Sequence, residues 1–309
     1  MTSTTTEANV STKIVLGKNQ YGKAEVRLVK ITRDTERHEI QDLNVTSQLH
    51  GDFTKAHIEG DNGRVVPTDT QKNTVYGLAR DGVGSVESFL VRLGEHFTSE
   101  FEWITGGRWA AEQYFWDRIN DHDHAFSTNK SEVRTAVLEI SENGEKNIVG
   151  GLSGLTVLKS TGSEFVGFPV DRFTTLKEAT DRILATDVTA RWRYNTEAVN
   201  AGGIDFDALY TSVRGHLLEQ FANNHSYALQ QTMFEMGRAV LEAHPEIDEI
   251  KFSLPNKHHF LVDLDAFGQD NPNEVFFAAD RPYGLIEATI TREGVAATHP
   301  IWENTPGFC

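Results

Sequence analysis

The clearest indication of the fold is the stretch VTARWRY, from Val188 to Tyr194. Its apolar residues alternate with Thr189, Arg191 and Arg193, so one face of the segment is apolar and the other is polar. Successive side chains point to opposite faces of a β-strand, and the pattern therefore predicts a half-buried strand. The same alternation recurs at residues 26–28, 136–140, 250–254, 260–264 and 286–290. Together these windows predict a largely antiparallel sheet with one face in water.

Helical periodicity occurs in three longer regions. Apolar residues recur at spacings of three and four over residues 86–97, 209–221 and 229–241, which predicts three amphipathic helices. Thr175 and Glu178 have the spacing of a helix capping box. We therefore expect a further short helix that begins at Thr175 and carries Arg182 about two turns in.

The order of these elements divides the chain into two halves. Each half contains strands, then helix, then strands, and the halves meet near residues 141–151, where the sequence ENGEKN predicts a hairpin-like turn. The length of 309 residues suits about two domains. We expect an α+β protein with a disordered tail over residues 1–11, a first module over 12–145, a second module over 146–300 and a C-terminal tail over 301–309. No residue-level repeat relates the modules, so the expected duplication rests on the order of elements.

The composition argues against several classes of protein. The 29 Lys and Arg residues against 45 Asp and Glu residues give a net charge of −16, which argues against nucleic acid or an anionic membrane as the main partner. The single cysteine is Cys309, which excludes a disulfide framework and a Cys-rich metal site. No apolar run is long enough to span a membrane, and the Ser- and Thr-rich N-terminus is unlike a signal peptide. We therefore expect a cytoplasmic protein.

Three short motifs carry little functional signal. Gly82-Val83-Gly84 lacks the third glycine of a dinucleotide fingerprint and is more typical of a loop. The run Asp121-His122-Asp123-His124 has metal-binding residue types, but its polar flanks favour a loop between strands. His258 and His259 are adjacent, so only one of them can point into a given pocket if they lie on a strand.

Seven windows, in order along the chain, together resemble the urate oxidase (uricase) family. The match runs from about Ile14 to about Arg292 and covers most of the chain. Seven ordered windows are far more specific than any one of them. They are QYGK at 20–23, VPTDTQKNT at 66–74, LSGLTVLKST at 152–161, SEF at 163–165, TTLKEATDR at 174–182, LQ at 229–230 and SLPNKH at 253–258.

The resemblance implies a fold of two tandem tunnelling-fold (T-fold) modules. Each module would be an antiparallel four-stranded sheet with a pair of helices, and the modules would form barrels when the chain assembles into a homotetramer. The resemblance also implies an oxidoreductase of purine degradation. It would convert urate, dioxygen and water into 5-hydroxyisourate and hydrogen peroxide, with no metal or organic cofactor.

Urate is a flat anion with amide-like edges, so its site should offer an aromatic face, a fork of donors and an amide. Phe165, Arg182 and Gln230 have these chemistries. The resemblance implies that Phe165 stacks beneath the ring, that Arg182 grips one edge with two hydrogen bonds, and that Gln230 reads an adjacent carbonyl and nitrogen. It also places the main-chain amide of Leu229 and the side chain of Leu176 beside the ring.

Oxidation without a cofactor requires a path for protons. The resemblance implies that Lys23, Thr68 and His258 form this path: Thr68 contacts the ring and a water, Lys23 polarises Thr68, and His258 connects to Lys23. Asn256 would hold dioxygen or water above the ring. Asp69 would contact the substrate through its main chain, so its carboxylate need not face the anion.

The resemblance places the residues of the two modules on different subunits, so the active sites would lie at subunit interfaces. Two other readings stay open. An oligomer that only binds a purine or pterin would need Phe165, Arg182 and Gln230 but no proton relay. A hydrolase on the same fold would usually require a metal held by His and Cys, for which the chain offers only His122 and His124.

Overall fold

The structure is a computed structural model that describes residues 13–128, 131–295, 299–303 and 305. The tail predicted over residues 1–11 and Cys309 lie outside the described residues, as does most of the C-terminal tail predicted over 301–309. None of the helices in the described ranges has the length and apolar character that a membrane crossing needs.

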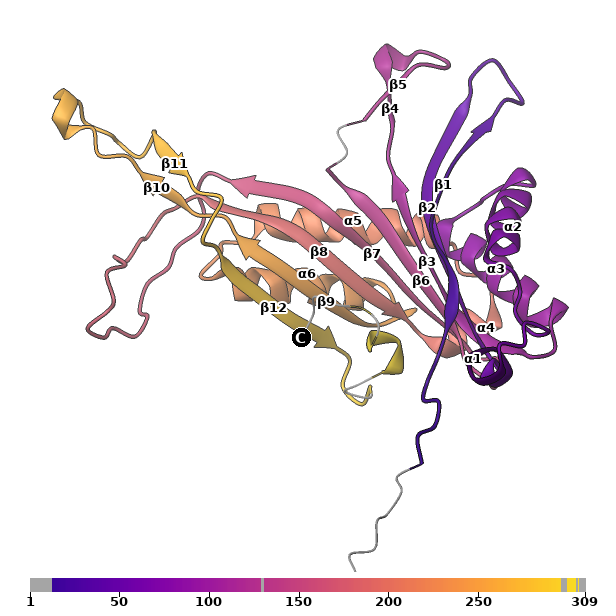
Figure 1. Ribbon diagram of the computed structural model, residues 1–309. Helices are drawn as coiled ribbons and strands as arrows, with labels where there is room; N and C mark the ends of the chain where they lie inside the picture. The colour runs from indigo at the N-terminus through magenta and orange to yellow at the C-terminus, as the bar shows by residue number, and fades with distance from the viewer. Residues whose placement is uncertain (1–12, 129–130, 296–298, 304, 306–309) are drawn as a thin grey trace, which may run out of the picture.

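An eight-stranded antiparallel sheet dominates the fold (Figure 1). Five of the six windows with alternating residues lie on its strands, so the predicted sheet is confirmed. On the apolar face of residues 188–194, Trp192 and Tyr194 are completely buried, as predicted. The opposite face is not wholly in water, because Arg193 is buried there in ion pairs with Asp248 and Glu249. In spatial order the strands are β1 (Tyr21–Thr32), β2 (Glu39–Gly51), β3 (Ile104–Tyr114), β6 (Val133–Ile140), β7 (Lys146–Lys159), β8 (Leu184–Tyr194), β9 (Ile247–Asn256) and β12 (Gly284–Thr291).

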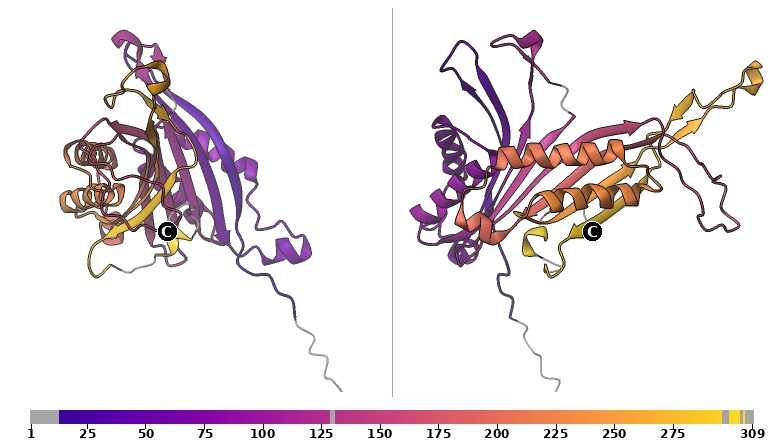
Figure 2. Two further views of the ribbon diagram at one scale, coloured as in Figure 1. Left: turned by 90° about the vertical axis from the view of Figure 1, so that its left-hand side faces the viewer. Right: turned by 180° about the vertical axis from the view of Figure 1, so that it is seen from behind.

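Two pairs of helices pack on the sheet and share one apolar core with it (Figure 2). The first pair, α2 (Thr68–Arg80) and α3 (Val86–Glu100), follows β2, and the second, α5 (Phe206–Asn223) and α6 (Leu229–Ala243), follows β8. The three helices predicted from periodicity are therefore confirmed, whereas α2 was not predicted. The shorter elements are α1 (Thr54–Glu59), α4 (Thr196–Ala201), β4 (Asp117–Arg118), β5 (Phe126–Ser127), β10 (His259–Leu261), β11 (Phe276–Ala278) and the single turns Ile119–Asp121, Asp265–Phe267 and Pro300–Trp302.

The halves of the chain meet along β6 and β7, which pair directly. The turn between them contains Gly144 at φ 81°, a left-handed conformation that glycine adopts without strain, and the predicted hairpin is confirmed. Arg134 on β6 ties the two helix pairs together, because its guanidinium binds Glu87 of α3 at 2.6 Å and Asp207 of α5 at 2.5 Å. Glu87 is completely buried, and burial raises its pKa while Arg134 opposes the rise.

The helix predicted to begin at Thr175 is wrong. Residues 160–183 instead form an irregular excursion between β7 and β8. Phe165 and Ala179 exchange both backbone hydrogen bonds, at 2.8 and 3.1 Å, which holds the two sides of the excursion in extended conformation. A capping pair needs an apolar stripe behind it to stabilise a short helix, and Leu176 is 59% exposed here.

The prediction of a half-buried strand over residues 260–264 is also wrong. Only the short strand β10 forms, and it pairs with β11 in a separate two-stranded sheet that projects from the body of the molecule (Figure 1). Phe260 and Leu261 are both about half exposed there. The alternating pattern in this window therefore does not mark a face of the core.

Candidate active site

The excursion between β7 and β8 carries Phe165 and Arg182 to one place. The backbone N–H of Arg182 donates to the carbonyl of Ser163 at 2.8 Å, and its Nε donates to Ser163 Oγ at 3.3 Å. Its guanidinium carbon lies 5.1 Å from the centre of the Phe165 ring. Phe165 also stacks on Phe168, with the ring centres 5.1 Å apart and the planes 14° from parallel. A cation and an aromatic ring are thus fixed side by side.

The charge of Arg182 is not neutralised within the described part of the chain, where no carboxylate forms an ion pair with it. The side chain is half-buried, and burial lowers its pKa. An arginine nevertheless stays protonated at neutral pH. A half-buried cation with no counter-charge favours an anionic ligand, because such a ligand restores the electrostatic stabilisation lost with water.

Leu229 and Gln230 begin helix α6 and are tied to the same excursion. Leu229 is buried and Gln230, the next residue, is exposed. Ser226 lies just before the helix, and its backbone pairs with the excursion: its N–H donates to Gly162 at 2.9 Å and its carbonyl accepts from Glu164 at 2.8 Å. The start of α6 therefore cannot move independently of Ser163, which lies between these two partners.

Asn256 and His258 follow from the end of strand β9. Asn256 is the last residue of the strand and pairs with Thr186 on β8 and Gly284 on β12. Burial lowers the pKa of His258, and the charges of Arg182 and His259 lower it further. His258 is therefore close to Arg182, and its lowered pKa favours the neutral imidazole, the form that accepts a proton. Lys257, between Asn256 and His258 in the sequence, forms an ion pair with Asp187, with its Nζ 2.6 Å from Oδ2 of the carboxylate.

Leu176 lies farther along the excursion and is exposed. The elements that carry the predicted residues of this group meet at one end of the sheet (Figure 1). The excursion carries Phe165, Leu176 and Arg182, helix α6 begins with Leu229 and Gln230, and Asn256 and His258 lie at the end of β9.

Lys23, Thr68 and Asp69 form a second group in the first half of the chain. Thr68 and Asp69 open helix α2, and the hydroxyl of Tyr21 on β1 donates to the carbonyl of Val66 at 3.1 Å, which ties the strand to the segment before the helix. The hydrogen bond from Lys72 lowers the pKa of Asp69, and the charge of Lys23 contributes to the same effect. Lys23 therefore lies near the start of α2. The side chains of Thr68 and Asp69 are exposed, and Lys23 is half-buried.

The elements that carry the two groups lie at opposite ends of the molecule in Figure 1 and in the right-hand view of Figure 2. Lys23 is on the edge strand β1, and β9 is six strand spacings away, about 30 Å along the sheet. The register adds a second displacement. Lys23 pairs with Ser47, Ser47 with Trp109 and Trp109 with Leu138, and this row of paired residues continues through β7 and β8 to the beginning of β9. Asn256 is at the other end of β9, about 30 Å along that strand. Within one chain the two groups cannot act on the same small molecule.

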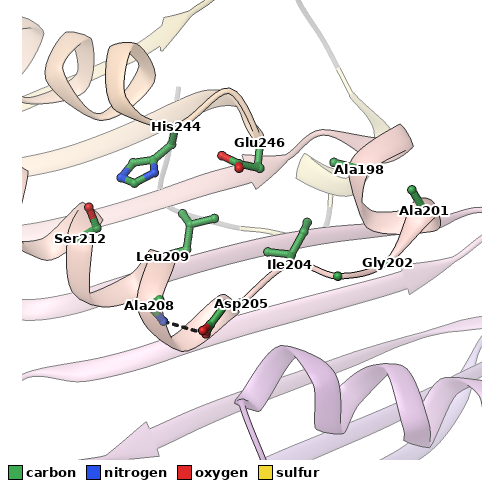
Figure 3. A pocket seen from close by; sticks show the side chains of 11 residues that line it. Ala198, Ala201, Gly202, Ile204, Asp205, Ala208, Leu209, Ser212, His244 and Glu246 are labelled. Atoms are coloured by element: carbon green, nitrogen blue, oxygen red, sulfur yellow. Dashed lines mark hydrogen bonds between the residues drawn. The ribbon is translucent and has the colours of Figure 1, made fainter.

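Two cavities lie elsewhere, and no predicted site residue lines them. The larger, of about 490 Å³, is bounded by residues that include Ile204, Leu209, His244 and Glu246 (Figure 3). The run from Asp121 to His124 is a loop, as expected, in which Arg37 forms ion pairs with Asp121 and Asp123. Within the described ranges, no group of three or more His, Cys, Asp or Glu side chains is arranged to hold a metal ion.

Sequence reasoning missed the hydroxyl groups beneath the site. Ser163, Ser226 and Thr232 are completely buried, and Thr232 donates to Ser226 at 2.7 Å. Ser163 stands in one of the matched windows, two residues before Phe165, but a buried serine carries no periodic signal that would single it out.

Comparison with known proteins gives one family. A family model described as Uricase matches residues 19–139 and 148–287. A uricase from Arthrobacter globiformis is 74% identical over 305 residues, covering 99% of each chain, and one from Cyberlindnera jadinii is 35% identical over 90% of this chain and 97% of the relative. The crystal structure of the Arthrobacter globiformis uricase superposes with a TM-score of 0.90 at 75% identity, covering 95% of this chain and all of that one.

Proposed function

The chain belongs to the uricase family, and on that premise we propose that it oxidises urate with dioxygen and water to 5-hydroxyisourate and hydrogen peroxide, without a metal or organic cofactor. As a uricase it is an oxidoreductase. The reaction moves two electrons from urate to dioxygen, and water supplies the hydroxyl group of the product. The observation that carries the proposal is the guanidinium of Arg182, which has no carboxylate partner among the described residues and lies beside the Phe165 ring and near His258.

The group around Arg182, from the second half of the chain, would bind and orient the substrate. Phe165 offers an aromatic face, Arg182 a fork of charged donors, and Gln230 an exposed amide one residue inside α6. The main-chain amide of Leu229 is at the start of the same helix, where N–H groups have no partner within the helix. Leu176 would pack beside the urate ring when a neighbouring subunit covers the excursion.

Lys23 and Thr68, from the first half of the chain, would move protons together with His258. Urate must lose a proton to become electron-rich enough for dioxygen, and the peroxide product must gain protons. We assign this path to Lys23, Thr68 and His258, because an amine, a hydroxyl and a neutral imidazole can pass a proton in sequence. Asn256 would hold dioxygen, and then water, over the ring, and Asp69 would contact the substrate through its main chain.

A complete site would then need two subunits. The separation of the two groups within one chain supports this arrangement, because only a second copy can bring Lys23 and Thr68 to Arg182. Large apolar side chains that are exposed in the single chain, among them Ile14, Phe267 and Phe277, also support burial against other copies. We propose a homotetramer with active sites at its subunit interfaces.

The order of elements supports two tandem T-fold modules, over residues 12–145 and 146–300. The first half supplies β1, β2, α2, α3, β3 and β6, and the second supplies β7, β8, α5, α6, β9 and β12. Each half is thus two strands, two helices and two strands. Because the sheet of one chain has two free edges, association of copies would close it into a barrel.

Urate oxidation by metal-stripped protein tests the proposed function. We expect protein treated with a chelator to consume dioxygen and to remove the ultraviolet absorbance of urate at the same rate as untreated protein. If the stripped protein binds urate but consumes no dioxygen, and a divalent metal restores consumption, the cofactor-free assignment is wrong. Binding with no turnover under either condition would favour a purine-binding oligomer.

A further inference from the structure

We propose that Ser163 is a positioning residue that orients the guanidinium of Arg182 toward the substrate. This inference rests on the proposed function, in which Arg182 grips one edge of urate. Ser163 itself is completely buried and would not touch the substrate.

Two hydrogen bonds to a single residue, Ser163, hold Arg182 in place. The carbonyl of Ser163 accepts from the Arg182 backbone N–H at 2.8 Å, and Ser163 Oγ accepts from Arg182 Nε at 3.3 Å. An arginine has two edges through which it can bind a flat ligand with paired hydrogen bonds, and one of them uses Nε. With Nε engaged by the serine, the two terminal nitrogens are the pair presented to a ligand.

Ser163 is itself immobilised on both sides. Its neighbours Gly162 and Glu164 each form a backbone hydrogen bond with Ser226, at 2.9 and 2.8 Å. Ser226 in turn accepts from Thr232 of α6 at 2.7 Å and donates to the carbonyl of Ala228 at 3.2 Å. The serine therefore holds Arg182 in a fixed position relative to the helix that carries Gln230. The guanidinium of Arg182 and the side-chain amide of Gln230 can then bind one ligand together.

The need for such an anchor follows from the charge of Arg182. In the described part of the chain no carboxylate holds the guanidinium, so its orientation depends on neutral contacts. The Phe165 ring restrains its distance but not its rotation, because a ring face offers no directional partner. The serine hydroxyl supplies the missing direction.

The test is the affinity for urate in the absence of dioxygen, measured by equilibrium titration so that no turnover occurs. We expect Ser163→Ala in the assembled protein to raise the Kd by about 5- to 10-fold, since a charge-assisted hydrogen bond is lost while the backbone anchor stays. In air, KM should rise by a similar factor and kcat should stay within about twofold.

The matched control is Thr161→Ala. Thr161 lies two residues away, and its hydroxyl donates to Asp181, the neighbour of Arg182, at 2.9 Å. Loss of this hydroxyl should leave the Kd unchanged. If Ser163→Ala fails to fold, Ser163→Cys keeps the side-chain size, offers only a weak acceptor and should show the same loss of affinity.

A double-mutant cycle with Arg182→Lys identifies the route of the effect. Lysine has no Nε donor, so Ser163→Ala should cause no further loss of affinity in that background. An unchanged Kd in Ser163→Ala, or an equal loss in the Arg182→Lys background, would overturn the proposal. If the wild type binds urate without dioxygen but does not oxidise it in air, the proposed function fails while the binding result for Ser163 still stands.

Discussion

Lys23→Met will lower kcat for urate oxidation by about 10²- to 10⁴-fold and change KM little. A side chain that transfers a proton in the rate-determining step contributes an effect of this size, and methionine has nearly the same length without a titratable amine. Lys23 is half-buried on strand β1, and its charge reaches Asp69 at the start of α2. The measurement is steady-state oxidation of urate followed by its absorbance.

Lys30→Met is the matched control for this prediction. Lys30 lies on the same strand, and its amine donates to the carbonyl of Arg80 at the far end of α2, at 2.9 Å. It should keep wild-type kcat. A Lys23→Met enzyme that keeps its kcat would remove Lys23 from the proton path, and equal losses in both variants would point to damage of the strand.

Arg182→Lys will weaken urate binding by about 1.5–3 kcal/mol, or roughly 10- to 150-fold in Kd. Lysine keeps the positive charge but replaces a planar fork with a single ammonium group, so the paired hydrogen bonds are lost. The ring contact with Phe165 also depends on the flat guanidinium. The affinity is measured by titration without dioxygen, so that a change in turnover does not affect it.

Arg172→Lys provides the comparison. Arg172 is exposed on the same excursion, with its guanidinium 4.5 Å from the Phe173 ring, and no role in binding is assigned to it. Its replacement should not alter the Kd. An Arg182→Lys protein with wild-type affinity would mean that another residue anchors the anion.

The sequence predicted the sheet and the longest helices because their apolar faces are continuous. The stripe over residues 86–97 is buried throughout. Helix α2 was missed because its buried face includes Gln71, a polar side chain that accepts from Ser47 at 3.1 Å inside the core. Periodicity of apolar residues cannot detect such a position.

Local signals also failed where tertiary contacts decide the backbone. The backbone pairing of Phe165 with Ala179 forms instead of the helix that the Thr175 capping pair predicted. A short helix at this place would have no buried face to stabilise it. The window at 260–264 alternates in sequence, yet its short strand finds only β11 as a partner.

The candidate site was predictable in part. The ordered windows named the residue types that a urate site needs, and the structure brings Phe165, Arg182 and His258 together. The contact that underlies the proposed role of Ser163 was not predictable, because it joins Ser163 to Arg182, nineteen residues later. The distance between the two groups follows from the strand order, which no single window contains.

Mixed assemblies of two inactive variants test the central claim, a site shared between subunits, most directly. Lys23→Met and Arg182→Gln each remove one group of the site, and the two chains are produced together in equal amounts so that they assemble at random. If sites form between subunits, about one quarter of them combine two intact groups, and the mixture should show about one quarter of wild-type activity. If each site lies within one chain, no site is intact, and activity no higher than that of the separate variants would contradict the account.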